Sequence, residues 1–551
     1  MMRTAFSTAA TAWFLSVLVA AAPGGAAQST GNATPKKTHR ADLFASSEDC
    51  LACHNGMRTG SGEDVSIGAD WRASMMANSG RDPYWMASVR REIADHQVAD
   101  AAIQDECSVC HLPMARTTHR AEGHPGEVFS HMPPRYDAQG LDKLAHDGVS
   151  CTVCHQITSQ KLGTPDSYTG GYVIDTRAGS PRPIYGPFEI DKGRTTVMRS
   201  SSGFTQQQAS HVQQSELCAT CHTLITTALG PRGEEIGRLP EQMPYEEWKH
   251  SDFATTRTCQ DCHMPAVEDT PVSSVLGNAR RLARHQFVGG NFFMLRMLNR
   301  YREDLAVVAP SIELDRSVNR TIAHLQREAA TLSIDSGGVS GGAVSFDVTA
   351  RNLSGHKLPT GYPSRRAWLH VVVRDRGGSV LFESGAVEPT GLIAGNDNDR
   401  DGGQVEPHYT QITSADQVQI YESVMGDSTG RPTTGLLNGV RYLKDNRLLP
   451  SGFDKATAGP DIAVVGAAAS DTDFAGGLDR VQFVVNVGAA TGPFQVDAEL
   501  RFQPIGYRWA QNLTQYDASE VKRFVRYYDS LAPASSEVLS RSTAQVSSSS
   551  R

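Results

Sequence analysis

Ten cysteines form five pairs with the same spacing. Two residues separate the members of each pair, and a histidine directly follows every second cysteine. The motifs CLACH, CSVCH, CTVCH, CATCH and CQDCH contain Cys50, Cys53, Cys107, Cys110, Cys151, Cys154, Cys218, Cys221, Cys259 and Cys262. In a CxxCH motif the two thiols can add to the two vinyl groups of one haem, while the adjacent imidazole binds the iron. The spacing therefore predicts five covalently bound haems c.

Disulfides and zinc are the alternative uses of paired cysteines. Ten cysteines in a secreted chain would ordinarily indicate disulfides, and paired CxxC knuckles can hold zinc. Zinc would need two pairs per site, and five pairs do not divide evenly. Neither alternative explains a histidine after every pair. With haem, the proximal iron ligands are His54, His111, His155, His222 and His263.

Each iron has a second axial face. Two imidazoles per iron favour a low-spin, six-coordinate haem suited to electron transfer. His211 and His250 precede the fourth and fifth motifs, and His285 precedes an apolar, glycine-containing stretch that could pack on a porphyrin. Met75 or Met76 could supply a thioether ligand, although methionine commonly fills a core. Three further histidines are expected to be structural: His96, His324 and His370.

The start of the chain has the features of a secretory signal peptide. Arg3 precedes a mostly apolar run from about 9 to 22 and small residues that end at Ala27. Pro23 ends the run short of the roughly 20 apolar residues that a membrane span needs. We expect residues 1–27 to be removed, which would place a mature chain without a membrane span in the periplasm or outside the cell.

The charge narrows the choice of partners. A formal net charge of -8 argues against nucleic acid, and haem propionates would make the protein more acidic. A redox protein that docks electrostatically would therefore present a basic surface. The sequence leaves open the identity of the partner or terminal electron acceptor and the oligomeric state.

The pattern of hydrophobic residues changes after the last motif. Residues 28–41 are polar and predict a flexible lead, and 42–307 predict a loop-rich, mainly α pentahaem domain with helices near 82–106, 242–251 and 290–305. After a helix near 313–331, six segments alternate with period two, which predicts a β-sandwich domain with flanking helices over 308–532. The serine-rich residues 533–551 predict a disordered tail.

One acidic segment partly matches a calcium-binding loop. Asp397, Asp399 and Asp401 alternate before Gly402, but His408 occupies the position where such a loop has glutamate. A solvated acidic loop is the preferred interpretation, and calcium is a weak alternative.

Several strings resemble one family of multihaem cytochromes c. They are SMMANSGRDPYW, DGVSCTVCHQI, ELCATCHTL, EWKHSDF with CQDCHMP, HQFVGGN and NLSGHKLPTGYPSRRAWLHV. Over about 45–530 the chain resembles proteins that join a cytochrome c-554-like haem domain to a C-terminal immunoglobulin-like β-domain. The resemblance implies electron transfer, and it implies His211, His250, His285 and His356 as distal ligands, with Met75 or Met76 as a fifth. His356 would have to reach the haem domain from the β-domain.

Three functions follow from these expectations. The first is an electron carrier that passes electrons between redox partners and needs no separate catalytic residue. The second is an enzyme that reduces nitrite, hydroxylamine or another small oxyanion at a five-coordinate haem. Pentahaem nitrite reductases have lysine at one motif, however, whereas all five motifs here end in histidine. The third is a subunit of an extracellular cytochrome filament or surface complex.

Overall fold

The computed structural model describes residues 43–177 and 182–547, which belong to one compact unit, His39–Arg551. The predicted signal peptide, 1–27, and the flexible lead, 28–41, lie outside the described residues. Among the residues that are described, none of the helices combines the length and apolar character that crossing a bilayer requires.

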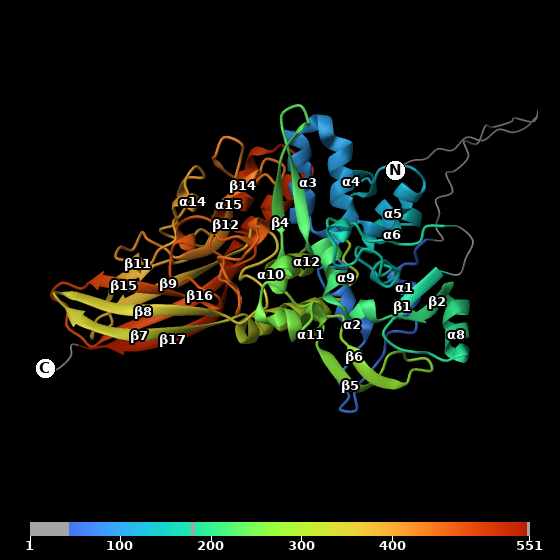
Figure 1. Ribbon diagram of the computed structural model, residues 1–551, viewed down its shortest axis with the longest axis horizontal. Coiled ribbons are helices and arrows are strands. Elements are labelled where there is room, and N and C mark those ends of the chain that lie inside the picture. Colours follow the sequence, from blue (N-terminus) through green and yellow to red (C-terminus); the bar gives the residue numbers. More distant parts are fainter. Residues whose placement is uncertain (1–42, 178–181, 548–551) are drawn as a thin grey trace, which may run out of the picture. The chain divides into compact units, whose positions relative to one another are not determined.

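Short helices make up most of the cysteine-containing part (Figure 1). They are α1 (Ser47–Leu51), α2 (Ile67–Arg72), α3 (Pro83–Asp95), α4 (Asp100–His111), α5 (Pro113–Ala121), α6 (Gly140–His146), α7 (Cys151–Cys154), α8 (Lys192–Ser202), α9 (Ser215–His222), α10 (Pro244–Lys249), α11 (Cys259–His263) and α12 (Phe292–Arg300). Three two-stranded sheets lie between them: β1 (Arg182–Gly186) with β2 (Phe204–Gln208), β3 (Leu224–Leu229) with β4 (Glu235–Gln242), and β5 (Ala266–Pro271) with β6 (Ala279–Ala283). The predicted mainly α, loop-rich organisation agrees with this part.

The helix predicted over 82–106 is two helices, α3 and α4. Asp82 caps α3 by accepting hydrogen bonds from the backbone N–H groups of Tyr84 and Trp85, and Pro83 occupies the first turn, where its missing N–H costs nothing. α3 ends at Asp95, and His96 has a non-helical backbone (φ -130°). The break lets α4 run separately to the second CxxCH motif.

Two sheets follow α13 (Ser311–His324). A four-stranded sheet has the order β11 (Gln411–Ile412), β15 (Leu478–Asn486), β8 (Ala343–Asn352), β7 (Ala330–Ser340). A seven-stranded sheet has the order β13 (Pro432–Thr433), β12 (Ile420–Gly426), β9 (Arg366–Arg374), β16 (Phe494–Gln503), β17 (Glu537–Val546), with β10 (Val380–Ser384) beside β9 and β14 (Arg441–Asp445) beside β12. Phe382 of β10 meets Phe483 of β15 between the sheets, with ring centroids 6.3 Å apart. All six period-two segments are strands, as predicted.

The C-terminal segment is ordered where the sequence predicted disorder from 533. Residues Glu537–Val546 form β17, which pairs antiparallel with β16 over its length. Leu539 and Val546 are buried, so the serine-rich strand still places apolar side chains against the core. The prediction of disorder, which rested on the serine content, was wrong because a strand at the edge of a sheet can bury one side and expose its polar side to water.

A helix near the end of the chain packs on the first helices. α16 (Ser519–Leu531) contacts α3 through Phe524 and Tyr84, with ring centroids 5.0 Å apart, and Glu520 forms an ion pair with Arg90 at 2.8 Å. α14 (Asp397–Arg400) and α15 (Tyr507–Gln511) complete the helices of this part. The first and last parts of the chain therefore share one core.

Candidate haem-binding site

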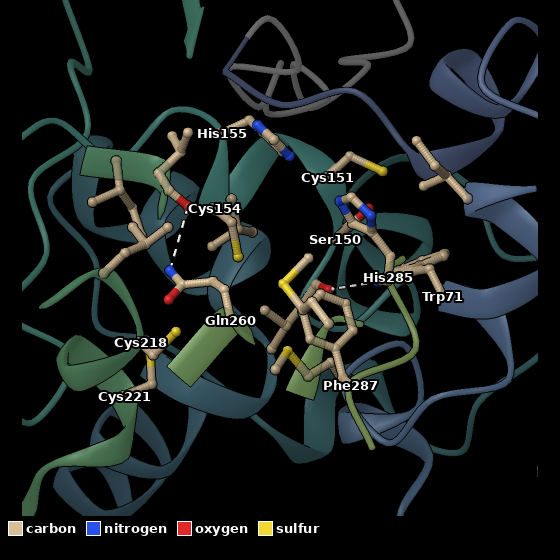
Figure 2. A pocket seen from close by; sticks show the side chains of 18 of the residues that line it. Trp71, Ser150, Cys151, Cys154, His155, Cys218, Cys221, Gln260, His285 and Phe287 are labelled. Atoms are coloured by element: carbon tan, nitrogen blue, oxygen red, sulfur yellow. Dashed lines mark hydrogen bonds between the residues drawn. The ribbon is translucent and has the colours of Figure 1, made fainter. Parts of the chain in front are cut away.

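Four of the five CxxCH motifs line a single cavity of about 1260 Å³. It is lined by Cys50, Cys53, Cys107, Cys110, Cys151, Cys154, Cys218 and Cys221, and the fifth motif borders it through Gln260 and Asp261. Figure 2 shows the sulfur atoms of the third and fourth motifs at the wall of this pocket. The volume exceeds the roughly 300–1,000 Å³ of a site for one small ligand. All ten cysteines are free thiols.

The imidazoles of four motifs are oriented by the backbone. In each, Nδ1 donates to a carbonyl oxygen at 2.5 to 3.2 Å: His54 to Val272, His111 to Ser79, His155 to Tyr185 and His263 to Val288. A histidine whose Nδ1–H is engaged in this way carries a lone pair on Nε2, and metal-ligating histidines typically have such a partner. Burial also lowers the pKa of His111 and His222 to about 4, which keeps these rings neutral at physiological pH. Burial also lowers the pKa of His155 and His263, so the rings of His111, His155 and His263 are in the form that binds iron.

Two histidines from outside the motifs lie opposite motif histidines. The ring centroids of His155 and His285 are 6.2 Å apart with an interplanar angle of 22°, and Figure 2 shows both rings at the pocket. Those of His263 and His356 are also 6.2 Å apart, with an angle of 12°. Two metal–nitrogen bonds of about 2 Å, plus about 1.1 Å from each nitrogen to its ring centroid, give about 6.2 Å. Both pairs therefore have the spacing of two imidazoles that share one metal ion.

The hydrogen bonds of these two distal candidates support the same assignment. Nδ1 of His285 donates to the carbonyl of Ala283 at 3.1 Å, and Nδ1 of His356 donates to that of Lys357 at 2.9 Å. Burial lowers the pKa of His285 to about 3 and that of His356 to about 4. Each ring thus leaves a neutral Nε2 available for iron.

The other predicted distal residues are placed differently. His211 donates from Nε2 to the carbonyl of Ile157 at 2.8 Å, and His250 donates from Nε2 to that of Asp454 at 3.0 Å. In both rings Nε2 is therefore engaged with a backbone carbonyl, unlike Nε2 of His285 and His356. Met75 lines the cavity, as does Met76.

Sequence reasoning missed three features near the motifs. The ring centroid of His324, which was expected to be structural, lies 6.2 Å from that of His263 at an interplanar angle of 53°. Trp85 stacks on His111 with ring centroids 4.4 Å apart and planes 2° apart. Buried carboxyl groups also line the cavity, and they come from α3 and β4. Only Trp85, in the string RDPYW, lay within a segment that the sequence had singled out.

Thiols of different motifs are neighbours. Hydrogen bonding with its partner thiol lowers the pKa of Cys50, Cys221 and Cys259, and the pairs are Cys50 with Cys151, Cys221 with Cys110, and Cys259 with Cys218. Burial is the largest cause of the raised pKa of Cys154, and the nearby thiol of Cys221 is the second. The first motif therefore adjoins the third, the third adjoins the fourth, and the fourth adjoins both the second and the fifth.

The acidic segment considered for calcium does not gather its carboxylates. The side chain of Asp399 binds Arg366 at 2.8 Å and the backbone N–H of Ile393 at 2.9 Å. His408 lies instead beside Asp471 and Asp479 in the β-part. Its Nδ1 accepts from the Gln419 amide at 2.9 Å, so the proton is on Nε2, which donates to Asp471 at 2.9 Å. These groups form a hydrogen-bonded network within the protein.

The chain was compared with known protein families, curated proteins and solved structures, and one solved structure has a similar fold. No model of a known protein family matches it, and no curated protein does either. Among solved structures, the penta-heme cytochrome c552 from Thermochromatium tepidum has a similar fold, with a TM-score of 0.50 and 16% identity, over 92% of this chain and 99% of that chain. At this identity the likeness concerns the fold, and the chain has a multihaem cytochrome c-like fold.

Proposed function

We propose that this protein is a pentahaem c-type cytochrome that transfers electrons between redox partners. The main support is the orientation of the motif histidines: four of five are held by backbone carbonyls with Nε2 available, and four of the five thiol pairs line one cavity. Bound haem would supply a one-electron redox couple at each motif. The chain supplies attachment, orientation and burial.

The two spaced histidine pairs support a proposal for two sets of axial ligands. His155 and His285 would hold the third iron, and His263 and His356 the fifth. His356 lies between β8 and β9, so this assignment ties the β-sandwich to the haem-binding part. Met75 remains a candidate for another iron because it lines the cavity. Bis-histidine ligation favours low-spin iron, which suits electron transfer.

The adjacency of the motifs defines a branched path. The first and third motifs lead to the fourth, and the fourth contacts both the second and the fifth through neighbouring thiols. The fourth motif is thus the junction of the proposed path. Electrons that enter at the first motif would reach the second or fifth only through it.

The proposal includes the cellular location of the protein and the charge of its redox partners. The signal-like first 27 residues support export to the periplasm or the cell exterior, where haem c is attached. The negative net charge favours redox partners with a basic surface.

A reductive titration of the haem-loaded protein tests electron transfer. The wild type should accept five electrons per chain, one for each motif. The double variant Cys218→Ser, Cys221→Ser should lose one haem and should also show a slow phase when a reductant is mixed rapidly, because the junction is missing. Cys259→Ser, Cys262→Ser is the matched control, which should lose one haem at a branch end without the slow phase. Uniform kinetics in both variants would contradict the proposed path.

A further inference from the structure

The cavity wall beside the second motif carries several ionisable side chains. Glu92 and Tyr84 come from α3, Glu241 comes from β4, and Tyr362 follows His356 in the loop before β9. Glu92 and Glu241 are only 3% and 5% exposed. Burial is the largest cause of the raised pKa of Cys107, followed by the charge of Glu106. The charges of Glu92 and Glu241 raise it further. The two carboxyls therefore lie near the place where haem would attach to the second motif, and the two tyrosines line the same cavity.

No second imidazole is available at this motif within the described cavity wall. Over residues 43–177 and 182–547, the one lining histidine outside the CxxCH motifs is His285, and its ring lies opposite His155. The aromatic ring that stacks on His111 is the indole of Trp85, which cannot ligate iron because its nitrogen is only a donor. The iron of the second motif thus lacks the partner that the third and fifth have.

We propose that the iron bound by His111 keeps an open axial position in this carboxylate-lined end of the cavity, and that the position binds small uncharged molecules in preference to anions. The inference rests on the proposed function, since it requires haem at the second motif. It identifies one motif as a ligand-binding site within an electron-transfer chain.

The charges of the wall support an uncharged ligand. Burial raises the pKa of Glu241 to about 7, so above neutral pH this group is predominantly anionic. Burial also raises the pKa of Glu92, whose carboxylate accepts from the backbone N–H of Leu436 at 2.8 Å. A buried negative charge repels an incoming anion strongly because the surrounding dielectric constant is low.

Two cations near this wall do not offer an anion a free donor site, and neither is among the groups that act on Glu241. Arg91 offsets part of the charge of Glu92, and its guanidinium binds Thr434 at 3.0 Å and Asp95 at 3.4 Å.

Arg365 lines the cavity, but it donates to the carbonyl of Thr360 at 2.7 Å and to the side chain of Asn291 at 3.0 Å. Burial and His263 are the larger causes of the lowered pKa of His222, and the charge of Arg365 adds to them. Arg365 therefore lies beside the fourth motif. The oxyanion substrate considered from the sequence is therefore disfavoured at the second motif, whereas tyrosine hydroxyls and carboxyls can exchange protons with a neutral ligand.

Electron paramagnetic resonance of the oxidised, full-length, haem-loaded protein tests the open position. We expect at least one high-spin ferric haem, which imidazole converts to low spin, and carbon monoxide binding after reduction; both signals should decrease in the double variant Cys107→Ser, Cys110→Ser, which removes the haem of the second motif. At pH 8, azide should bind the wild type at least about tenfold more weakly than the Glu241→Gln variant, since a nearby buried charge at an effective dielectric constant near 20 is worth more than that. Imidazole should bind both proteins nearly equally.

A matched control removes a buried carboxyl elsewhere. Asp479→Asn alters a fully buried side chain of β15, outside the cavity wall, and should leave azide and imidazole binding unchanged. If Glu241→Gln does not fold, Tyr362→Phe and the wild-type spectra still test the site. Five low-spin haems and no carbon monoxide binding would overturn the inference while leaving the proposed function intact, and fewer than five haems would instead contradict the proposed function. Equal azide affinity in wild type and Glu241→Gln would overturn the preference for uncharged ligands.

Discussion

A buried ionic network next to His356 supports a quantitative prediction. Lys357 is fully buried, and its Nζ lies 2.8 Å from Asp445. Arg447 bridges Asp445 at 2.7 Å and Glu247 at 2.9 Å. Burial alone would raise the pKa of Asp445, but Arg447 and Lys357 hold it at about 2. Two cations therefore balance two anions, and the network joins the loop of His356 to α10 and β14.

Lys357→Met should leave one negative charge without compensation. At 2.8 Å the lost attraction is about 6 kcal/mol at an effective dielectric constant of 20, and the cost of burying the lysine offsets part of it. Removing one partner of a buried pair generally costs about 3–5 kcal/mol. Because Asp445 keeps Arg447, we expect about 3 kcal/mol in the free energy of unfolding, measured by urea denaturation of the haem-loaded protein.

The double variant Lys357→Met, Asp445→Asn restores the charge balance, because Arg447 and Glu247 still form a pair. It should be more stable than Lys357→Met alone by at least about 1 kcal/mol, a coupling expected of contacting residues. Lys522→Met, which removes an exposed partner of Asp517, should have no measurable effect. A loss below about 1 kcal/mol in Lys357→Met, or purely additive costs in the double variant, would refute the account of this network.

Three further predictions concern histidines. His285→Ala should convert one low-spin haem to high spin, seen by electron paramagnetic resonance, because His285 lies opposite His155; an unchanged spectrum would exclude it as a ligand. His250→Ala should leave every spin state unchanged, because its Nε2 donates to a backbone carbonyl, and a new high-spin signal would contradict this. Burial alone would lower the pKa of His370, but Glu499 and Glu383 raise it, while His370 is the main cause of a Glu499 pKa of about 2. The stability from this pair should thus be fully present below the ordinary histidine pKa of about 6.5 and fall, by about 1 kcal/mol or less, as the pH rises through the raised value. Urea denaturation at pH 5.5 and 8.5 should show the fall in the wild type but not in His370→Gln.

Local signals in the sequence sufficed to predict attachment motifs and to find the strands. The CxxCH spacing is contained within five residues, so nothing distant is needed to recognise it. Alternation with period two marked strands such as β15 and β16, which bury one face, whereas β12 is buried at every position and was recognised from its run of strand-forming residues. β17 was not predicted, because its apolar residues are few and its pairing with β16 joins separate parts of the chain.

Sequence proximity did not indicate which histidine rings lie opposite the motif histidines. His250 lies closer to the fifth motif in the chain than His356 does, yet it is His356 whose ring lies opposite His263. The carboxylate-lined end of the cavity could not be predicted from the sequence either, because Glu92, Glu241 and Tyr362 come from widely separated segments. Which groups share a cavity is decided by tertiary packing, and neither periodicity nor spacing encodes it.

The number of haems per chain tests the central claim most directly. Intact-mass spectrometry of the mature protein, with haem quantified as its pyridine complex, should give five covalently bound haems and no free thiol among the ten cysteines. Fewer than five haems in protein made with an active haem-attachment system, or cysteines found in disulfides or bound to zinc, would contradict the account.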